Sequence, residues 1–292
     1  MKPDILRNIP MADYIADKLG DVPTLNAGAC HDLLTRSPLH CWTNHPRLNP
    51  NYQSESNEKA DIGSAAHELL IGGESRIVEI PFEDYRKNDA KALRDAAWAE
   101  GKTPVLYSKL PAVERMKEIA MNYIMGSEIG NFGYGGDYAE LTLLWQEGDS
   151  WCRARPDWLT ADRKWHISYK TTAGSAEPES WIRNHLTLDG YDLSAVHYER
   201  GVEALTKVDC QTVFLVQEQA DPFSCSLIGL SPAMRDLASR KLDRAIALWS
   251  SSMATGKWPA YPTRICYAEP KPWEVAQQEE QELRNFELGG QA

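Results

Sequence analysis

Apolar residues recur at helical spacing through much of the first 126 residues. In residues 58–72, EKADIGSAAHELLIG, the side chains of Ile62, Ala66, Leu69 and Leu70 fall on one side of a helix, which Gly72 and Gly73 end. Further helices are predicted from Asn26 through AGACHDLL, over 88–100 and over 110–126, with a Pro- and Asn-rich loop after the first of them. The pattern therefore predicts a mostly helical N-terminal portion.

The pattern changes near residue 140. Short apolar stretches joined by the turn-like segments EGDS and TADR predict three consecutive strands, and further strands and helices follow. This order indicates an α/β fold with a central mixed β-sheet flanked by helices. We expect a weakly structured lead-in over 1–24, one domain over 25–270 and an acidic helical tail over 271–292. The expected strands cover 140–146, 151–159, 164–170, 211–219 and 223–230, and the later helices cover 191–205, 232–256 and the tail from Pro272.

Composition narrows the class of protein. The 292 residues suffice for one large domain, and the six cysteines are scattered without a C-x-x-C pair, so neither a disulfide framework nor a zinc site is expected. No run of 18 apolar residues and no signal-peptide pattern occurs, which predicts a cytoplasmic protein without a membrane segment. The net charge of −11 argues against non-specific coating of nucleic acid, but it is compatible with an enzyme that has a locally basic groove.

One stretch, RARPDWLTADRKWHISYKTTAG at 153–174, carries candidate chemistry. Side chains alternate along a strand, so Ser168 and Lys170 point the same way, while Asp157 lies across the hairpin and Glu140 begins an earlier strand. Two carboxylates and a lysine at one end of a sheet suit phosphodiester hydrolysis, because carboxylates hold Mg²⁺ and a lysine stabilises developing charge. The alternative is a common Pro-Asp dipeptide and a solvated lysine at a strand end.

A wider set of segments resembles a known family. RARPDWL, ISYKTTAGSAEPESW, GYDLSAVHYERGVEAL, SPLHCWTNHPRLNP and DIGSAAHELLIGG together resemble the PD-(D/E)xK nuclease superfamily over roughly residues 25–270. Within it they are similar to the phage RecE-type exonucleases (exonuclease VIII), which are related to λ exonuclease. The resemblance implies a restriction-endonuclease-like core with Asp157 as a metal ligand, Lys170 as the catalytic lysine, and His67 and Glu140 close to the metal.

The same resemblance implies cofactor and partners. It implies Mg²⁺ (or Mn²⁺) as the cofactor, double-stranded DNA ends as the substrate in phage recombination, a ring-shaped homo-oligomer, and a single-strand annealing protein as a partner. Arg153 and Arg155 flank the motif and are candidates to reach DNA phosphates, the alternative being ordinary surface arginines. Trp158 is a candidate to wedge against a base, the alternative being a core residue. His67, taken by itself, is equally compatible with a packed core histidine.

Two positions depart from the family pattern. The family has an acid where Ser168 stands, and a glutamine where Ser194 precedes Tyr198 in a Q-x-x-x-Y pattern. A serine hydroxyl is neutral and a weak Mg²⁺ ligand, so we expect metal affinity to fall. Three interpretations stay open: an active Mg²⁺-dependent exodeoxyribonuclease with impaired activity, a catalytically inactive relative that binds DNA or a partner protein, and an engineered serine in an otherwise active enzyme.

Overall fold

A computed structural model describes residues 1–53, 62–71, 77–130 and 138–289. It divides into two units, Met1–Ala260 and Tyr261–Ala292. The glycine-rich loop before Tyr138 and parts of the predicted helix 58–72 lie outside the described residues. In unit 1 the helices are α1 (Met11–Ile15), α2 (Ala27–Thr35), α3 (Pro38–Asn44), α4 (Ile62–Ile71), α5 (Asn88–Ala99), η1 (Tyr107–Lys109), α6 (Leu110–Met125), α7 (Pro178–Trp181), the π-helix η2 (Ile182–Leu186), α8 (Tyr191–Thr206) and α9 (Pro232–Thr255).

The strands form three sheets in the described part of the chain. One sheet has the order β1-β4-β5, a small one pairs β2 with β3, and the third has the order β6-β7-β8-β9. In the third sheet β7 and β8 are parallel, while β6 and β9 pair antiparallel at the two edges, which confirms the predicted mixed sheet. The strands are β1 (Asp4–Leu6), β2 (Ile77–Ile80), β3 (Thr103–Leu106), β4 (Thr142–Glu147), β5 (Ser150–Ala154), β6 (Trp158–Leu159), β7 (Trp165–Thr172), β8 (Gln211–Glu218) and β9 (Cys225–Gly229).

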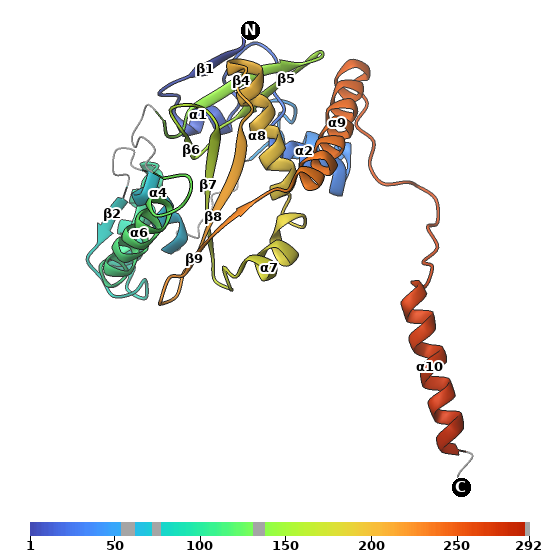
Figure 1. Cartoon of the computed structure of the whole chain (residues 1–292). Coiled ribbons are helices and arrows are strands. Elements are labelled where there is room, and N and C mark those ends of the chain that lie inside the picture. The colour runs from blue at the N-terminus through green and yellow to red at the C-terminus, as the bar shows by residue number, and fades with distance from the viewer. Residues whose placement is uncertain (54–61, 72–76, 131–137, 290–292) are drawn as a thin grey trace. The chain divides into compact units, whose positions relative to one another are not determined.

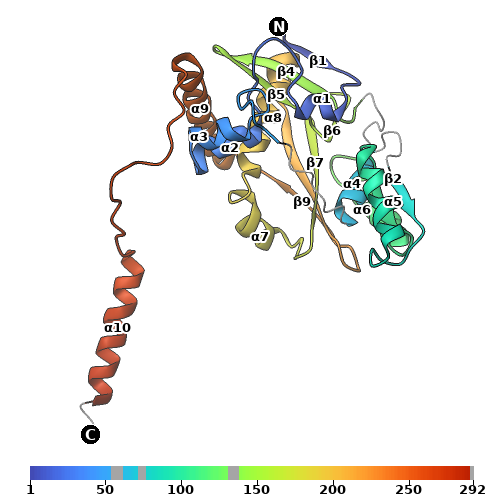
Figure 2. The same cartoon turned by 180° about the vertical axis from the view of Figure 1, so that it is seen from behind.

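Helices cover both faces of the mixed sheet, with α4 and α6 on one face and α7 and α8 on the other (Figures 1 and 2). Alternation along the strands explains this arrangement. On β7 and β8, Ile167, Tyr169 and Leu215 belong to the apolar cluster of α4 and α6, whereas Phe214 and Val216 belong to a cluster with Trp181. Both central strands are therefore buried on two sides over most of their length.

The predicted meander is interrupted at Pro156. The stretch expected as one strand over 151–159 instead forms β5, which pairs with β4, and the two-residue β6, which pairs with β7. Proline lacks the N–H that a ladder needs, so the chain leaves one sheet before it joins the next. Asp157 thereby lies at the junction, immediately before β6.

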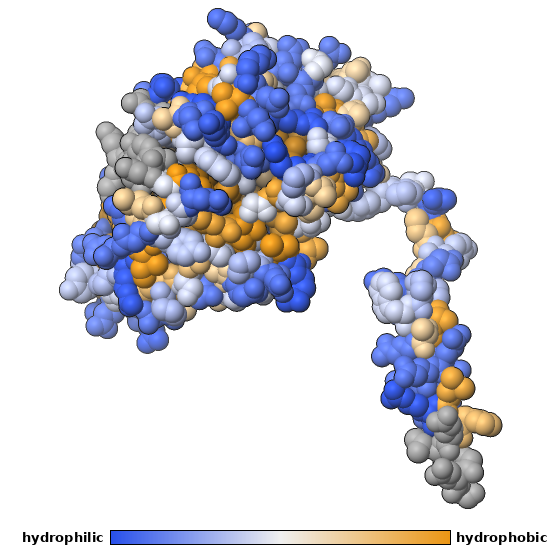
Figure 3. Space-filling model, in the orientation of Figure 1, coloured by the Kyte–Doolittle hydropathy of each residue, from blue (hydrophilic) through white to orange (hydrophobic). Residues whose placement is uncertain are grey.

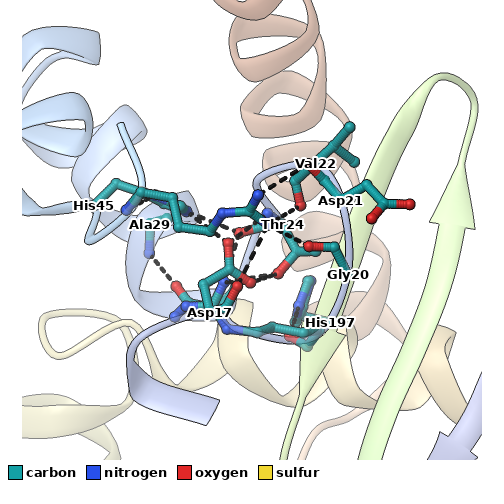
Figure 4. A network of polar contacts seen from close by, with 11 residues as sticks. Asp17, Gly20, Asp21, Val22, Thr24, Ala29, His45 and His197 are labelled. Carbon is teal, nitrogen blue, oxygen red and sulfur yellow. Dashed lines mark hydrogen bonds and ion pairs between the residues drawn. The ribbon is translucent and has the colours of Figure 1, made fainter. Parts of the chain in front are cut away.

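The first 24 residues are part of the fold, which corrects the expected lead-in. Strand β1 pairs with β4, and the fully buried Asp17 contacts Arg153 Nη1 at 2.9 Å and accepts a hydrogen bond from the Thr24 N–H at 2.9 Å. His45 Nε2 lies 3.6 Å from the same carboxylate. Figure 4 shows this network around Asp17, Thr24 and His45. A buried ion pair, hydrogen-bonded through Arg153 Nη1 and the Thr24 N–H, fixes the segment against β5.

Unit 2 contains helix α10 (Pro272–Gly289), as the sequence predicts. Large apolar side chains stay exposed on it, with Trp273 at 62% and Phe286 at 82% of full exposure. Figure 3 shows apolar side chains along one side of this helix and hydrophilic ones on the rest. No described helix of either unit is long and apolar enough to cross a membrane. All six cysteines are free, four of them buried.

Candidate active site

The site forms at the edge of the mixed sheet where β6 begins. Trp158 pairs with Ile167, so Asp157 comes opposite Ser168 with no further β6 residue beside Tyr169. The Asp157 carboxylate takes the place of that missing strand, because its Oδ2 accepts a hydrogen bond from the Tyr169 N–H at 2.8 Å. The main chain of β7 therefore fixes the carboxylate at the sheet edge.

Two basic side chains converge on this carboxylate. Lys170 Nζ lies 3.8 Å from Asp157 Oδ2, and His67 Nε2, from α4, lies 3.3 Å from Asp157 Oδ1. Both basic groups keep contact with solvent, with 27% of the Lys170 side chain and 33% of the His67 side chain exposed. They border an open cleft of about 390 Å³, which is also lined by Gly63, Ser64, Glu68, Tyr169 and Thr171.

Asp157 and His67 each shift the pKa of the other. Burial raises the pKa of the Asp157 carboxyl, but Lys170 and His67 outweigh burial and hold that pKa well below its usual range. Burial lowers the pKa of His67, whereas Asp157 raises it, and the resulting pKa lies above the usual value. Asp157 is thus an ionised carboxylate across the neutral range.

Ser168 lies where the family pattern has an acid. Its hydroxyl donates a hydrogen bond to Asp157 Oδ2 at 3.2 Å. A carboxylate at this position would instead face the Asp157 carboxylate, and two such groups need a cation between them. The hydroxyl removes both the repulsion and the charge that attracts a metal.

Comparison with known families identifies the class of domain to which this chain belongs. A family model described as a PDDEXK-like domain of unknown function matches residues 42–269, which is most of the chain. The chain belongs to this family. Its fold class and its PD-(D/E)xK relationship are therefore as the sequence motifs indicated, and the domain is of the nuclease type.

One solved structure shares the fold of this PDDEXK-like chain. A crystal structure of a "Putative exonuclease" from Eubacterium rectale matches with a TM-score of 0.55 and 8% identity, covering 92% of this chain and 98% of that one. An alkaline exonuclease (LHK-Exo) from Laribacter hongkongensis covers 66% of this chain and 94% of its own, at 15% identity and a TM-score of 0.29, which is too low to support an argument. No curated protein matches the sequence.

The structure places Glu140 beside Asp157 by its main chain. The Glu140 N–H donates to the Asp157 carbonyl oxygen at 3.1 Å, and Glu140 has a positive φ of 48°. Its carboxylate contacts the guanidinium of Arg155 at 3.2 Å. The side chain of Glu140 is therefore engaged with Arg155, and its predicted role at a metal stays a prediction.

The structure corrects the DNA-contact predictions for Arg153 and Trp158. Arg153 is 2% exposed and binds Asp17 and Thr24, so its guanidinium belongs to the buried network and does not reach DNA phosphates. Trp158 is fully buried against α4 and α6, which excludes it as a wedge between bases. Arg155 is 8% exposed, and its guanidinium donates to the Ile9 carbonyl oxygen and to Glu140. These side chains make contacts inside the fold, and the motif in the sequence does not show those contacts.

The remaining predicted residues lie on α8. The Ser194 N–H donates to the Gly190 carbonyl oxygen in the first turn, and Tyr198 stacks on His166 with ring centroids 4.7 Å apart. His166 precedes Ser168 by two residues on β7, so Tyr198 supports the strand that carries the site. Contact of Ser194 and Tyr198 with DNA stays a prediction.

Sequence analysis missed Tyr191 at the start of α8. Lys170 Nζ lies 5.7 Å from the centroid of its ring, within reach of a cation–π contact, and the ring stacks on Trp181 at 5.3 Å. The segment GYDLSAVHY contains this tyrosine, but only the fold brings it to the lysine.

The donor set suits a divalent cation in part. His67 and Asp157 offer one imidazole nitrogen and one carboxylate, and Ser168 adds a weak hydroxyl ligand. The part of the chain that the structure describes contains no cluster of three His, Cys, Asp or Glu residues able to hold a metal. The cleft therefore offers a metal one carboxylate, the ligand type that Mg²⁺ prefers, together with one imidazole, and lacks the second carboxylate.

Proposed function

We propose that the protein is a divalent-metal-dependent DNA exonuclease that acts on double-stranded DNA ends, with metal binding weakened by Ser168. The observation that carries this proposal is the convergence of Lys170 and His67 on the partly buried carboxylate of Asp157 at the sheet edge. The PDDEXK-like family and the exonuclease named among the structural neighbours support the same class of chemistry.

Each side chain has a distinct task in this proposal. Asp157 and His67 would hold Mg²⁺ or Mn²⁺, and such an ion supplies a bound water of lowered pKa and neutralises phosphate charge. Lys170 lies on the solvent side of Asp157, where its ammonium stabilises negative charge on the phosphate oxygens. Tyr191 faces the same ammonium and limits its positions.

A second candidate is a nuclease-fold protein that binds DNA or a partner protein without cutting. The hydrogen bond from the Ser168 hydroxyl to Asp157 favours it, because a neutral donor stabilises the carboxylate without a metal. The wider roles in phage recombination, in a ring-shaped homo-oligomer and with a single-strand annealing protein rest on the RecE-type resemblance. A cytoplasmic location is a separate prediction, made from the sequence pattern.

Digestion of DNA tests the proposal. We expect slow loss of linear duplex DNA with Mg²⁺ or Mn²⁺ and none of covalently closed circles, and Lys170→Ala should reduce the rate about 100-fold or more. Lys164→Ala is the matched control, because Lys164 is an exposed lysine at the turn before the same strand. Equal rates for Lys170→Ala and the control would contradict the assignment. DNA binding without digestion in all variants would favour the second candidate.

A further inference from the structure

A second cleft lies at the start of α4. It has a volume of about 320 Å³ and is lined by Ile62, Tyr85, Leu106, Lys109 and Gln219, together with the neighbouring backbone of β3. Its walls come from α4, β3 and the loop after β8, so it is formed by rigid elements of unit 1 rather than by a single loop.

This second cleft adjoins the candidate active site at two points. Ile62 lines the second cleft, and the next residue of α4, Gly63, lines the active-site cleft. On the opposite side, Gln219 Nε2 donates to Thr171 Oγ1 at 3.0 Å, and Thr171 lines the active-site cleft. The two hollows are therefore neighbours along one surface of the protein.

The separation along α4 matches the repeat of a nucleotide strand. Ile62 and His67 are five residues apart, which is about 7.5 Å along a helix at 1.5 Å per residue. A strand of B-form DNA advances about 3.4 Å per nucleotide. A strand that follows α4 from a phosphate at Lys170 and His67 therefore reaches the second cleft within about two nucleotides, measured as rise along a duplex axis.

The lining of the second cleft suits a nucleotide better than a small apolar ligand. Ile62, Leu106 and Tyr85 offer apolar surface for a base, a mode of binding that tolerates any base. The guanidinium of Arg94 lies 5.3 Å from the centroid of the Tyr85 ring, so a base there meets a ring that already contacts one cation. Lys109 is exposed and makes no ion pair with any residue in the described ranges, so its charge is available for a phosphate. Such a local cation matters more in a chain whose net charge is −11.

We propose that the second cleft is a subsite for the DNA strand, holding a nucleotide about two positions from the scissile phosphate. Apolar contact with Tyr85 and Leu106 receives the base, and Lys109 receives the phosphate. This inference rests on the proposed function, since it assigns the substrate strand a path away from Lys170.

Binding and digestion of DNA with Lys109 variants test the subsite. The probes are a fluorescein-labelled single-stranded dT12 and a linear duplex, and the variants are Lys109→Glu and Lys109→Arg. Lys91→Glu is the matched control, because it makes the same charge change on the exposed side of α5, outside the cleft lining. We expect Lys109→Glu to weaken binding of dT12 about 5- to 10-fold and to lower the salt slope by about 0.7.

The kinetic pattern separates this inference from the proposed function. Lys109→Glu should raise KM for the duplex with kcat unchanged, while Lys109→Arg should behave as the parent protein. If the parent protein digests DNA and Lys109→Glu matches Lys91→Glu, the subsite is wrong and the proposed function stands. Equal losses in Lys109→Arg and Lys109→Glu would also contradict a charge-based subsite. A parent protein that neither binds nor digests DNA would overturn both.

Discussion

At the scale of single residues, Asp157 is the side chain that the other groups of the site contact. Its carboxylate accepts a hydrogen bond from the Tyr169 N–H beside the start of β6. The same carboxylate lies next to the basic groups of Lys170 and His67. The motif in the sequence predicts Asp157 and Lys170, because their residue types and spacing indicate their chemistry. Tyr191 was not predicted, since its contact with Lys170 depends on the packing of α8 against the sheet.

Buried histidines give a prediction for pH dependence. Burial lowers the pKa of His166 and of His197 to about 4 in each case, despite the opposing effect of nearby acids. An unfolded histidine titrates near 6.5, so between about pH 6.5 and 4 the unfolded chain binds protons that the folded chain does not. The free energy of unfolding is thus highest above pH 6.5 and falls by roughly 1.4 kcal/mol per pH unit for each histidine as pH falls.

Urea unfolding between pH 7 and pH 4.5 measures this slope. His166→Gln should make the slope shallower by about one proton. An identical slope in the parent protein and in His166→Gln would show that His166 does not titrate as its burial requires.

At the scale of elements, the pattern of apolar residues predicts most helices and the central strands. It does so because α6, α8 and α9 are amphipathic and β8 has an apolar centre, VFLV, between polar ends. It does not predict the break at Pro156 or the pairing of β1 with β4, which depend on partners distant in the sequence. A glycine in α8 shows the same dependence, since a Cβ at Gly201 would lie 2.8 Å from the ring of Trp145 on β4.

The buried network around Asp17 yields a prediction about the N-terminal segment. Asp17→Ala leaves the guanidinium of Arg153 buried without its counter-charge, which should cost about 3–5 kcal/mol in the free energy of unfolding. Asp21→Ala is the matched control, because the structure uses the backbone carbonyl of Asp21, which accepts from Arg47, and its side chain is exposed. Chemical denaturation compares the two. A loss in Asp17→Ala no larger than in the control would mean that the first 24 residues contribute little to the fold.

At the scale of the whole molecule, the chain has two units with different character. Unit 1 contains the PDDEXK-like fold and both clefts, and unit 2 is an acidic helix with exposed Trp273, Leu283 and Phe286. The family match ends at residue 269, so the matched region stops before α10. A net charge of −11 predicts that DNA binding depends on a few local cations such as Lys170 and Lys109.

The rates of duplex digestion by the parent chain and by Ser168→Asp test the central claim most directly. Ser168→Asp restores a second carboxylate opposite Asp157, which should strengthen metal binding and raise the rate with Mg²⁺ by about 10-fold or more. Ser175→Asp makes the same change at an exposed position after β7 and should leave the rate unaltered. A parent chain already as fast as Ser168→Asp, or a Ser168→Asp variant that digests no DNA, would contradict the assignment of Ser168 as the missing metal ligand.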